Sequence, residues 1–74
     1  MDRFILKQHL AEAEACVTLG MHHIEQQRDL IAKLESGGCD SAEARGLLAL
    51  FEELQVEHIV HRDRLRNELS VIPD

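Results

Sequence analysis

Histidine and cysteine are the residues in this chain with the widest choice of chemistry. The 74 residues include five histidines and two cysteines. His58 and His61 are three residues apart and share one face of a helix, while His22, His23 and Cys16 lie close together earlier in the chain. A structural zinc site needs about four such ligands in a tetrahedron. The spacing matches no known zinc motif, so we favour His58 and His61 as polar residues that set helix pairing, with His23 and Cys16 as the other candidate ligands if a metal binds.

Composition argues against several other functions. No nucleophile, base and orienting group form a recognisable set, so we expect no enzymatic activity and no cofactor. The chain has no Trp or Tyr and only two Phe, which argues against an aromatic pocket for a small-molecule substrate. A formal net charge of −6 disfavours nucleic-acid binding. The alternative depends on a basic stretch, Arg62, Arg64 and Arg66, although Asp63 interrupts it.

The beginning of the chain predicts no export or membrane segment. Its only strongly apolar run is Phe4-Ile5-Leu6, whereas a secretory signal needs about 7–15 apolar residues and a membrane span about 20. We therefore expect a cytoplasmic protein that does not enter a membrane. In that reducing compartment Cys16 and Cys39 are expected to be free thiols.

The residues around the middle of the chain predict a turn between two helices within a single domain, residues 1–74. Gly37 or Gly38 can supply the left-handed residue that commonly ends a helix. Asp40 is a good N-cap, and Glu43 lies three residues later, as in a capping box. The expected elements are a helix over about residues 2–35, a turn over about 36–40 and a helix over about 41–70.

Apolar residues at alternating steps of four and three indicate a heptad seam on both helices. On the first helix the seam is Leu6, Leu10, Ala13, Val17, Gly20, Ile24, Gln27, Ile31 and Leu34, with Gln27 as its one polar member. On the second helix it is Leu47, Phe51, Leu54, His58, His61, Leu65 and then Leu69 or Ile72. The two seams predict an all-α fold, an antiparallel helical hairpin with coiled-coil-like packing.

Folding the chain at Cys39 pairs the two seams along their whole length. In this register Gly20 faces His58 and Val17 faces His61, and the residue numbers of facing positions add to 78. Gly20 would leave room for an imidazole there. Beside the seam, the register places His23 opposite Glu57 and Glu14 opposite Arg62.

The apolar surface is wider than one partner helix can cover. Residues that flank the seam or extend behind it are Cys16 and Leu30 on the first helix and Leu48, Val56, Ile59 and Val60 on the second. A face of this breadth favours a bundle of three or four helices, and the simplest bundle is two hairpins related by a two-fold axis. We therefore expect a homodimer that uses these six residues as its interface, or an unidentified protein partner on the same face.

Short stretches of the sequence resemble a set of small, uncharacterised helical proteins of proteobacteria. The matching stretches are Gln8-His9-Leu10-Ala11-Glu12-Ala13-Glu14, His23-Ile24 with Gln27-Arg28, Ala42-Glu43-Ala44-Arg45 with Leu47-Leu48, and His61-Arg62-Asp63-Arg64-Leu65. The resemblance spans about residues 8 to 69. That group has no assigned activity, so the resemblance implies a helical fold and transfers no site or substrate.

Three functions follow as expectations. The leading one is a non-enzymatic helical module for interaction or oligomerisation. The second is a small dimeric nucleic-acid-binding regulator that uses the Arg62, Arg64 and Arg66 region. The third is metal or pH sensing through His58 and His61, because burial in the seam would disfavour charged imidazoles and acid would then weaken the fold.

Overall fold

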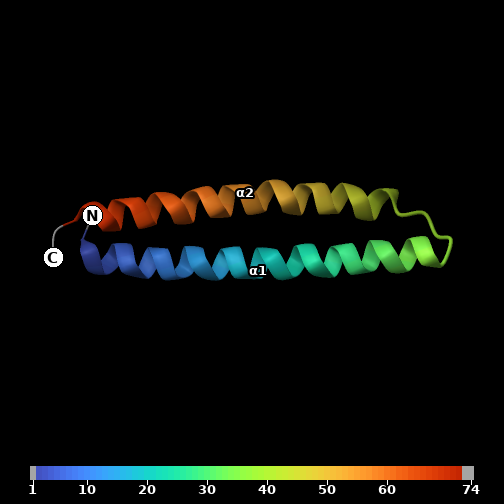
Figure 1. Ribbon diagram of the computed structural model, residues 1–74, viewed down its shortest axis with the longest axis horizontal. Coiled ribbons are helices and arrows are strands. Elements are labelled where there is room, and N and C mark those ends of the chain that lie inside the picture. The colour runs from blue at the N-terminus through green and yellow to red at the C-terminus, as the bar shows by residue number, and fades with distance from the viewer. Residues whose placement is uncertain (1, 73–74) are drawn as a thin grey trace.

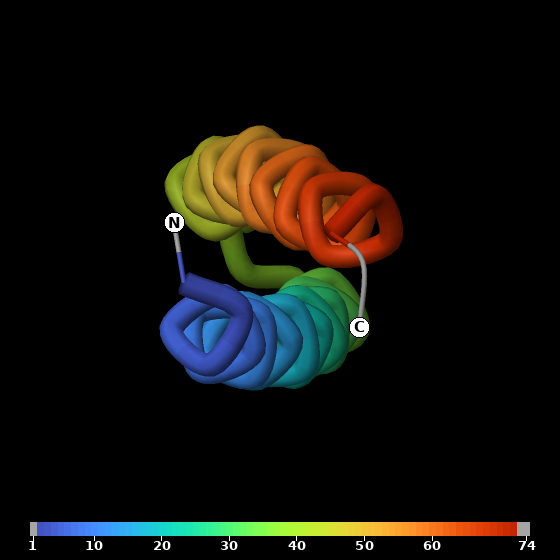
Figure 2. The backbone as a smooth tube through the Cα atoms, turned by 90° about the vertical axis from the view of Figure 1, so that its left-hand side faces the viewer, coloured from blue at the N-terminus to red at the C-terminus, as the bar shows by residue number. Residues whose placement is uncertain are grey.

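Two long helices lie side by side and run in opposite directions. The computed structural model describes residues 2–72, with helix α1 at Arg3–Ser36 and helix α2 at Ala42–Val71. Figure 1 shows the two helices joined by one turn, with both ends of the chain at the opposite end of the rod. The molecule measures 58 × 14 × 13 Å, and Figure 2 shows the helices as two stacked tubes that cross slightly. The predicted all-α antiparallel hairpin is confirmed.

Helix α1 follows the predicted seam closely. Its first turn is capped by Asp2, whose Oδ1 accepts a hydrogen bond from the Phe4 amide at 3.3 Å. The seam residues are all buried or half-buried, namely Leu6, Leu10, Ala13, Val17, Gly20, Ile24, Gln27, Ile31 and Leu34. Apolar periodicity alone was therefore sufficient to identify the inward face of this helix.

The end of α1 is a Schellman turn built on the glycine pair. Gly38 takes the left-handed conformation, with φ of 73°, which a residue without Cβ adopts at no steric cost. The Cys39 amide donates to the Leu34 carbonyl at 2.8 Å, and the Gly38 amide donates to the Glu35 carbonyl at 3.2 Å. These bonds satisfy carbonyls at the helix end and reverse the chain.

The predicted capping of α2 by Asp40 with Glu43 is wrong by one residue. Ser41 occupies the N-cap position, and no side chain caps the helix from there. The Asp40 carboxylate still accepts a hydrogen bond from the Ala42 amide at 3.0 Å. The Ser41 hydroxyl instead donates to the Glu35 carboxylate at 2.8 Å, so a contact with α1 takes the place of a local cap.

Three of the seven predicted seam positions on α2 are also wrong. Leu47 and Leu54 are 42% and 41% exposed, and His61 is exposed as well. The buried and half-buried residues of α2 and its C-cap are instead Ala44, Leu48, Phe51, Gln55, His58, Ile59, Arg62, Leu65, Leu69 and Ile72. The inward face is thus rotated from the predicted one, and it passes through the polar residues Gln55 and Arg62.

Gln55 explains the rotation and the pairing register. It is buried, and its Nε2 donates to the Val17 carbonyl across the helix interface at 2.8 Å. A Cβ at Gly20 would lie 2.0 Å from Gln55 Oε1, so Gly20 accommodates Gln55 rather than His58. The register therefore differs from the predicted one by three residues at this point, close to one helical turn.

A second buried glutamine repeats this arrangement nearer the turn. Gln27 Nε2 donates to the Ala44 carbonyl at 2.9 Å. Each glutamine thus satisfies its amide against the backbone of the opposite helix, which is the condition for burying a polar side chain without a large penalty. No buried side-chain nitrogen or oxygen atom among residues 2–72 lacks a partner.

Most of the apolar core lies near the ends of the chain. Leu6, Ala13 and Leu65 are buried together, and Leu10, Leu69 and Ile72 pack against them. The Arg3 guanidinium donates to the Ile72 carbonyl at 3.3 Å over this end. Within the described residues neither helix is apolar enough over sufficient length to cross a membrane.

Candidate functional site

Three hollows follow one long side of the hairpin. The central hollow has a volume of about 90 Å³ and is lined by Gly20, His23, Phe51, Leu54 and His58. The hollow nearer the turn is lined by His23, Gln26, Gln27, Leu30 and Phe51, and the one nearer the chain ends by His9, Glu12, Ala13, Cys16 and His61. All three lie between α1 and α2. We call this side of the molecule the hollow flank.

Helical spacing places the residues of these hollows on one face of α1. His9, Glu12, Cys16, His23, Gln26 and Leu30 follow one another at steps of three, four or seven. Residues at such steps form one stripe on a helix. The hollows are therefore parts of one continuous strip beside the seam.

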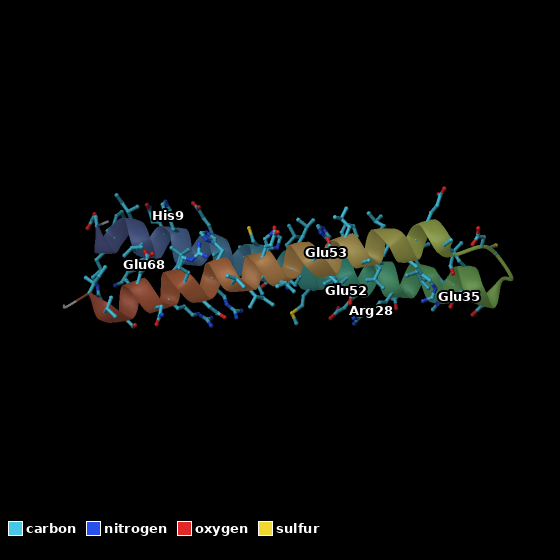
Figure 3. The ribbon with its side chains drawn as sticks, turned by 90° about the horizontal axis from the view of Figure 1, so that it is seen from above. His9, Arg28, Glu35, Glu52, Glu53 and Glu68 are labelled. Atoms are coloured by element: carbon cyan, nitrogen blue, oxygen red, sulfur yellow. The ribbon has the colours of Figure 1, made fainter. Side chains whose placement is uncertain are left out.

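The opposite side of the hairpin is crossed by ion pairs, and we call it the ion-pair flank. Arg66 pairs with Glu14 at 3.1 Å and Arg28 with Glu52 at 3.4 Å. Arg45 pairs with Glu35 near the turn, and its Nε donates to Glu35 Oε2 at 2.9 Å. In Figure 3 His9 points out at one edge of the rod, while Arg28 and Glu35 lie at the other.

These pairs also repeat with the heptad. The α1 members, Glu14, Arg28 and Glu35, are separated by multiples of seven residues, and so are the α2 members, Arg45, Glu52 and Arg66. One position in each series has no ion pair, and it is occupied by Met21 on α1 and by Ile59 on α2. The predicted pairing of Glu14 with Arg62 is wrong, because Arg66 takes Glu14 and Arg62 pairs with its neighbour Asp63 at 3.0 Å.

Glu35 has the most perturbed environment on the ion-pair flank. The hydrogen bond from Arg45 is the largest cause that lowers the pKa of the Glu35 carboxyl below its ordinary value of 4.5. The hydrogen bond from Ser41 acts in the same direction. Both interactions favour the charged carboxylate, so the turn end of the hairpin is tied together by an ionised Glu35.

The histidines gather on the hollow flank. Four of the five line its hollows, His9, His23, His58 and His61, and only His22 lines none of them. In the central hollow the ring of His23 lies 5.9 Å from the ring of Phe51, rather than in the predicted pair with Glu57. His58 is half-buried, with its Nδ1 3.4 Å from Gln55 Oε1.

The four candidate metal ligands do not converge. His23 and His58 line the central hollow, whereas Cys16 and His61 line the hollow nearer the chain ends. Among residues 2–72 no three side chains of His, Cys, Asp or Glu are grouped so as to hold a metal ion. Cys16 and Cys39 are both free and exposed.

The six predicted interface residues are dispersed over the hairpin. Cys16 and Leu30 line hollows on the hollow flank. Leu48 and Ile59 are half-buried within the hairpin, while Val56 and Val60 are 61% and 50% exposed and line none of the hollows. The prediction missed Leu54 as a surface residue, because its hydropathy placed it in the seam. Only recognition of Gln55 as a seam residue would have turned Leu54 outward.

The basic stretch is largely neutralised by acidic neighbours. Arg62 pairs with Asp63, and Arg66 pairs with Glu14 and lies 4.0 Å from Asp63. Arg64 is exposed and takes part in none of these ion pairs. Two of the three guanidinium groups thus already hold a carboxylate, which leaves little positive surface for a phosphate backbone.

Comparison with known proteins adds no assignment. No protein-family model matches this chain, and no curated protein or solved structure matches it significantly. The main functional feature of the molecule is the contrast between a flank crossed by ion pairs and a flank that carries hollows, imidazoles and exposed leucines.

Proposed function

We propose that this chain is a non-enzymatic self-association module, in which two copies join their hollow flanks to form a four-helix bundle. The observation that carries the proposal is the difference between the flanks. Arginines and carboxylates already satisfy each other across the ion-pair flank. The hollow flank exposes Leu30 and Leu54 beside its hollows, 45% and 41% accessible. Exposed apolar strips with polar edges are typical of interfaces.

The exposed area of the chain supports a second layer. The hairpin exposes 5440 Å², whereas a compact monomer of 8.4 kDa would expose roughly 4,600 Å². The difference, about 800 Å², is close to what each partner buries in a standard interface. A second copy on one flank would therefore give this chain the exposed area of an ordinary compact protein.

The small core supports the same conclusion. The buried apolar residues of the described chain are Leu6, Ala13, Val17, Ile31 and Leu65. A single layer of contacts in a chain this short supplies little stability, and small folds commonly gain the rest by oligomerisation. A two-fold dimer is favoured because each copy then uses the same flank and the assembly closes on itself.

The mass in solution tests the proposal. Sedimentation equilibrium should give about twice the chain mass of 8.4 kDa. Leu30→Glu or Leu54→Glu should weaken association at least about tenfold, since 1.4 kcal/mol corresponds to a factor of ten and a buried unpaired charge costs more than that. At concentrations where the variant is still dimeric, helix content by circular dichroism should be unchanged, because both side chains are already partly exposed in the single chain.

A matched variant distinguishes the hollow flank from the outward face of α2 as the site of association. Val60→Glu introduces the same charge at a residue that is 50% exposed but lies outside the hollows. The proposal expects this variant to dimerise like the wild type. A monomeric wild type would contradict self-association, and a dimer broken by Val60→Glu but not by Leu54→Glu would move the interface to the outward face of α2.

A further inference from the structure

We propose that acidification separates the two copies, because the central hollow brings two imidazoles per chain into the dimer interface. The inference rests on the self-association proposed above. His23 lines the hollow from α1, and His58 lines it from α2 together with Phe51 and Leu54. The second copy would cover this hollow and remove both imidazoles from water.

No carboxylate is placed to compensate a charged imidazole in this hollow. Besides the two histidines, its walls are Gly20, Phe51 and Leu54. The adjoining hollow toward the turn shares His23 and Phe51 and adds only the amides of Gln26 and Gln27 and the side chain of Leu30. The polar contact of His58 is the side chain of Gln55, which is also neutral.

Glu57 directly precedes His58 on α2, but it is exposed and lines none of the three hollows. One turn along α2 from His58 are His61, which is exposed, and Arg62, whose guanidinium already pairs with Asp63. From α1, the carboxylate on the hollow flank is Glu12, which lines the neighbouring hollow with His61. A proton on His23 or His58 would therefore add positive charge to a hollow with apolar and amide walls.

The direction of the effect follows from proton linkage. Histidine ordinarily changes charge near pH 6.5, and covering an imidazole disfavours its charged form. In the open single chain, water still reaches the hollow and solvates the imidazolium. The dimer consequently binds fewer protons than two separate chains, and association weakens as the pH falls through the range in which histidine titrates.

Overall charge acts in the opposite direction, so the sign of the pH effect is informative. The chain carries a formal net charge of −6 at pH 7, and its isoelectric point is about 5.2. Acidification toward that point reduces the repulsion between two copies and would by itself strengthen association. Weaker association in mild acid therefore identifies a local cost that exceeds the general trend.

The experiment measures the dimer dissociation constant at physiological salt between about pH 7.5 and about pH 5.8, the range that brackets histidine titration. We expect it to rise at least about tenfold toward acid, since each imidazole that loses its proton on association contributes up to a factor of ten per pH unit. The double variant His23→Gln with His58→Gln should reduce the change to less than about twofold. His22→Gln is the matched control, because His22 is exposed and outside every hollow.

The outcomes distinguish the two proposals. A wild type that is monomeric at every pH overturns self-association and the inference with it. A stable dimer that is insensitive to pH, or that tightens in acid, overturns the inference alone. So does His22→Gln if it removes the pH effect. If the double variant fails to dimerise at neutral pH, the two single variants decide, because each must then release fewer protons on association than the wild type.

Discussion

The two flanks of the hairpin share one heptad repeat and differ in how their side chains are satisfied. On the ion-pair flank, arginine and glutamate alternate across the gap at multiples of seven residues. On the hollow flank, the same spacing carries histidines, Cys16 and Leu30. Exposed ion pairs contribute little energy, but they suit a surface that stays in water. The difference indicates which side of a bundle would face solvent and which would face a second layer.

Gly20 and Gln55 provide the largest test of this contrast, because Gly20 lines the central hollow and Gln55 packs directly against Gly20. Gly20→Ala should lower the free energy of unfolding by about 1–2 kcal/mol, since the new methyl group displaces Gln55 from its buried bond to Val17. In a Gln55→Ala background the same change should stabilise by about 1 kcal/mol through helix propensity. Chemical denaturation of the four proteins in this cycle measures both values.

The opposite sign in the two backgrounds is the critical result for that cycle. If Gly20→Ala is stabilising in both, Gln55 does not depend on the space above Gly20, and another contact sets the register. Gly46→Ala is a useful control, because a Cβ at Gly46 meets no atom within 4 Å. It should stabilise by about 1 kcal/mol in either background.

Removing an ion pair should have a smaller effect. Arg28→Ala, Glu52→Ala and the double variant should each change the free energy of unfolding by less than about 1 kcal/mol, because the pair is exposed to solvent. The dissociation constant of the dimer should not change beyond about twofold, since this flank faces away from the proposed interface. Unfolding and sedimentation measurements on the same samples test both expectations. A monomeric double variant would contradict the proposal, because it would place the dimer interface on the ion-pair flank.

The smallest expected effect is the acid sensitivity of the turn end. Hydrogen bonds from Arg45 and then Ser41 lower the pKa of Glu35 in the folded chain below 4.5. The contribution of Glu35 to stability is therefore fully present above pH 4.5 and is lost as the pH falls through the lower folded value. Thermal melts of the wild type and Glu35→Gln should converge on acidification below pH 4.5, and parallel melting curves would contradict this origin.

Much of the hairpin was predictable because its determinants are local. The glycine pair, with Gly38 in the left-handed conformation, ends α1 where the sequence predicts a break. On α1 the apolar residues and the single polar member, Gln27, occupy the buried positions that their spacing predicts. The failure is confined to α2, where Leu54 and His61 were placed inside and Gln55 outside. Hydropathy favours leucine over glutamine at a buried position unless a partner for the amide is known.

The sequence by itself determined two amphipathic helices, the turn between them and their antiparallel arrangement. Only the tertiary structure decided which face of α2 turns inward, and hence that His23 and His58 share a hollow while His61 does not. The physical reason is that Gln55 can be buried only where the Val17 carbonyl accepts its amide and Gly20 leaves space for it. That requirement joins atoms on two helices, so no periodicity within either helix can reveal it.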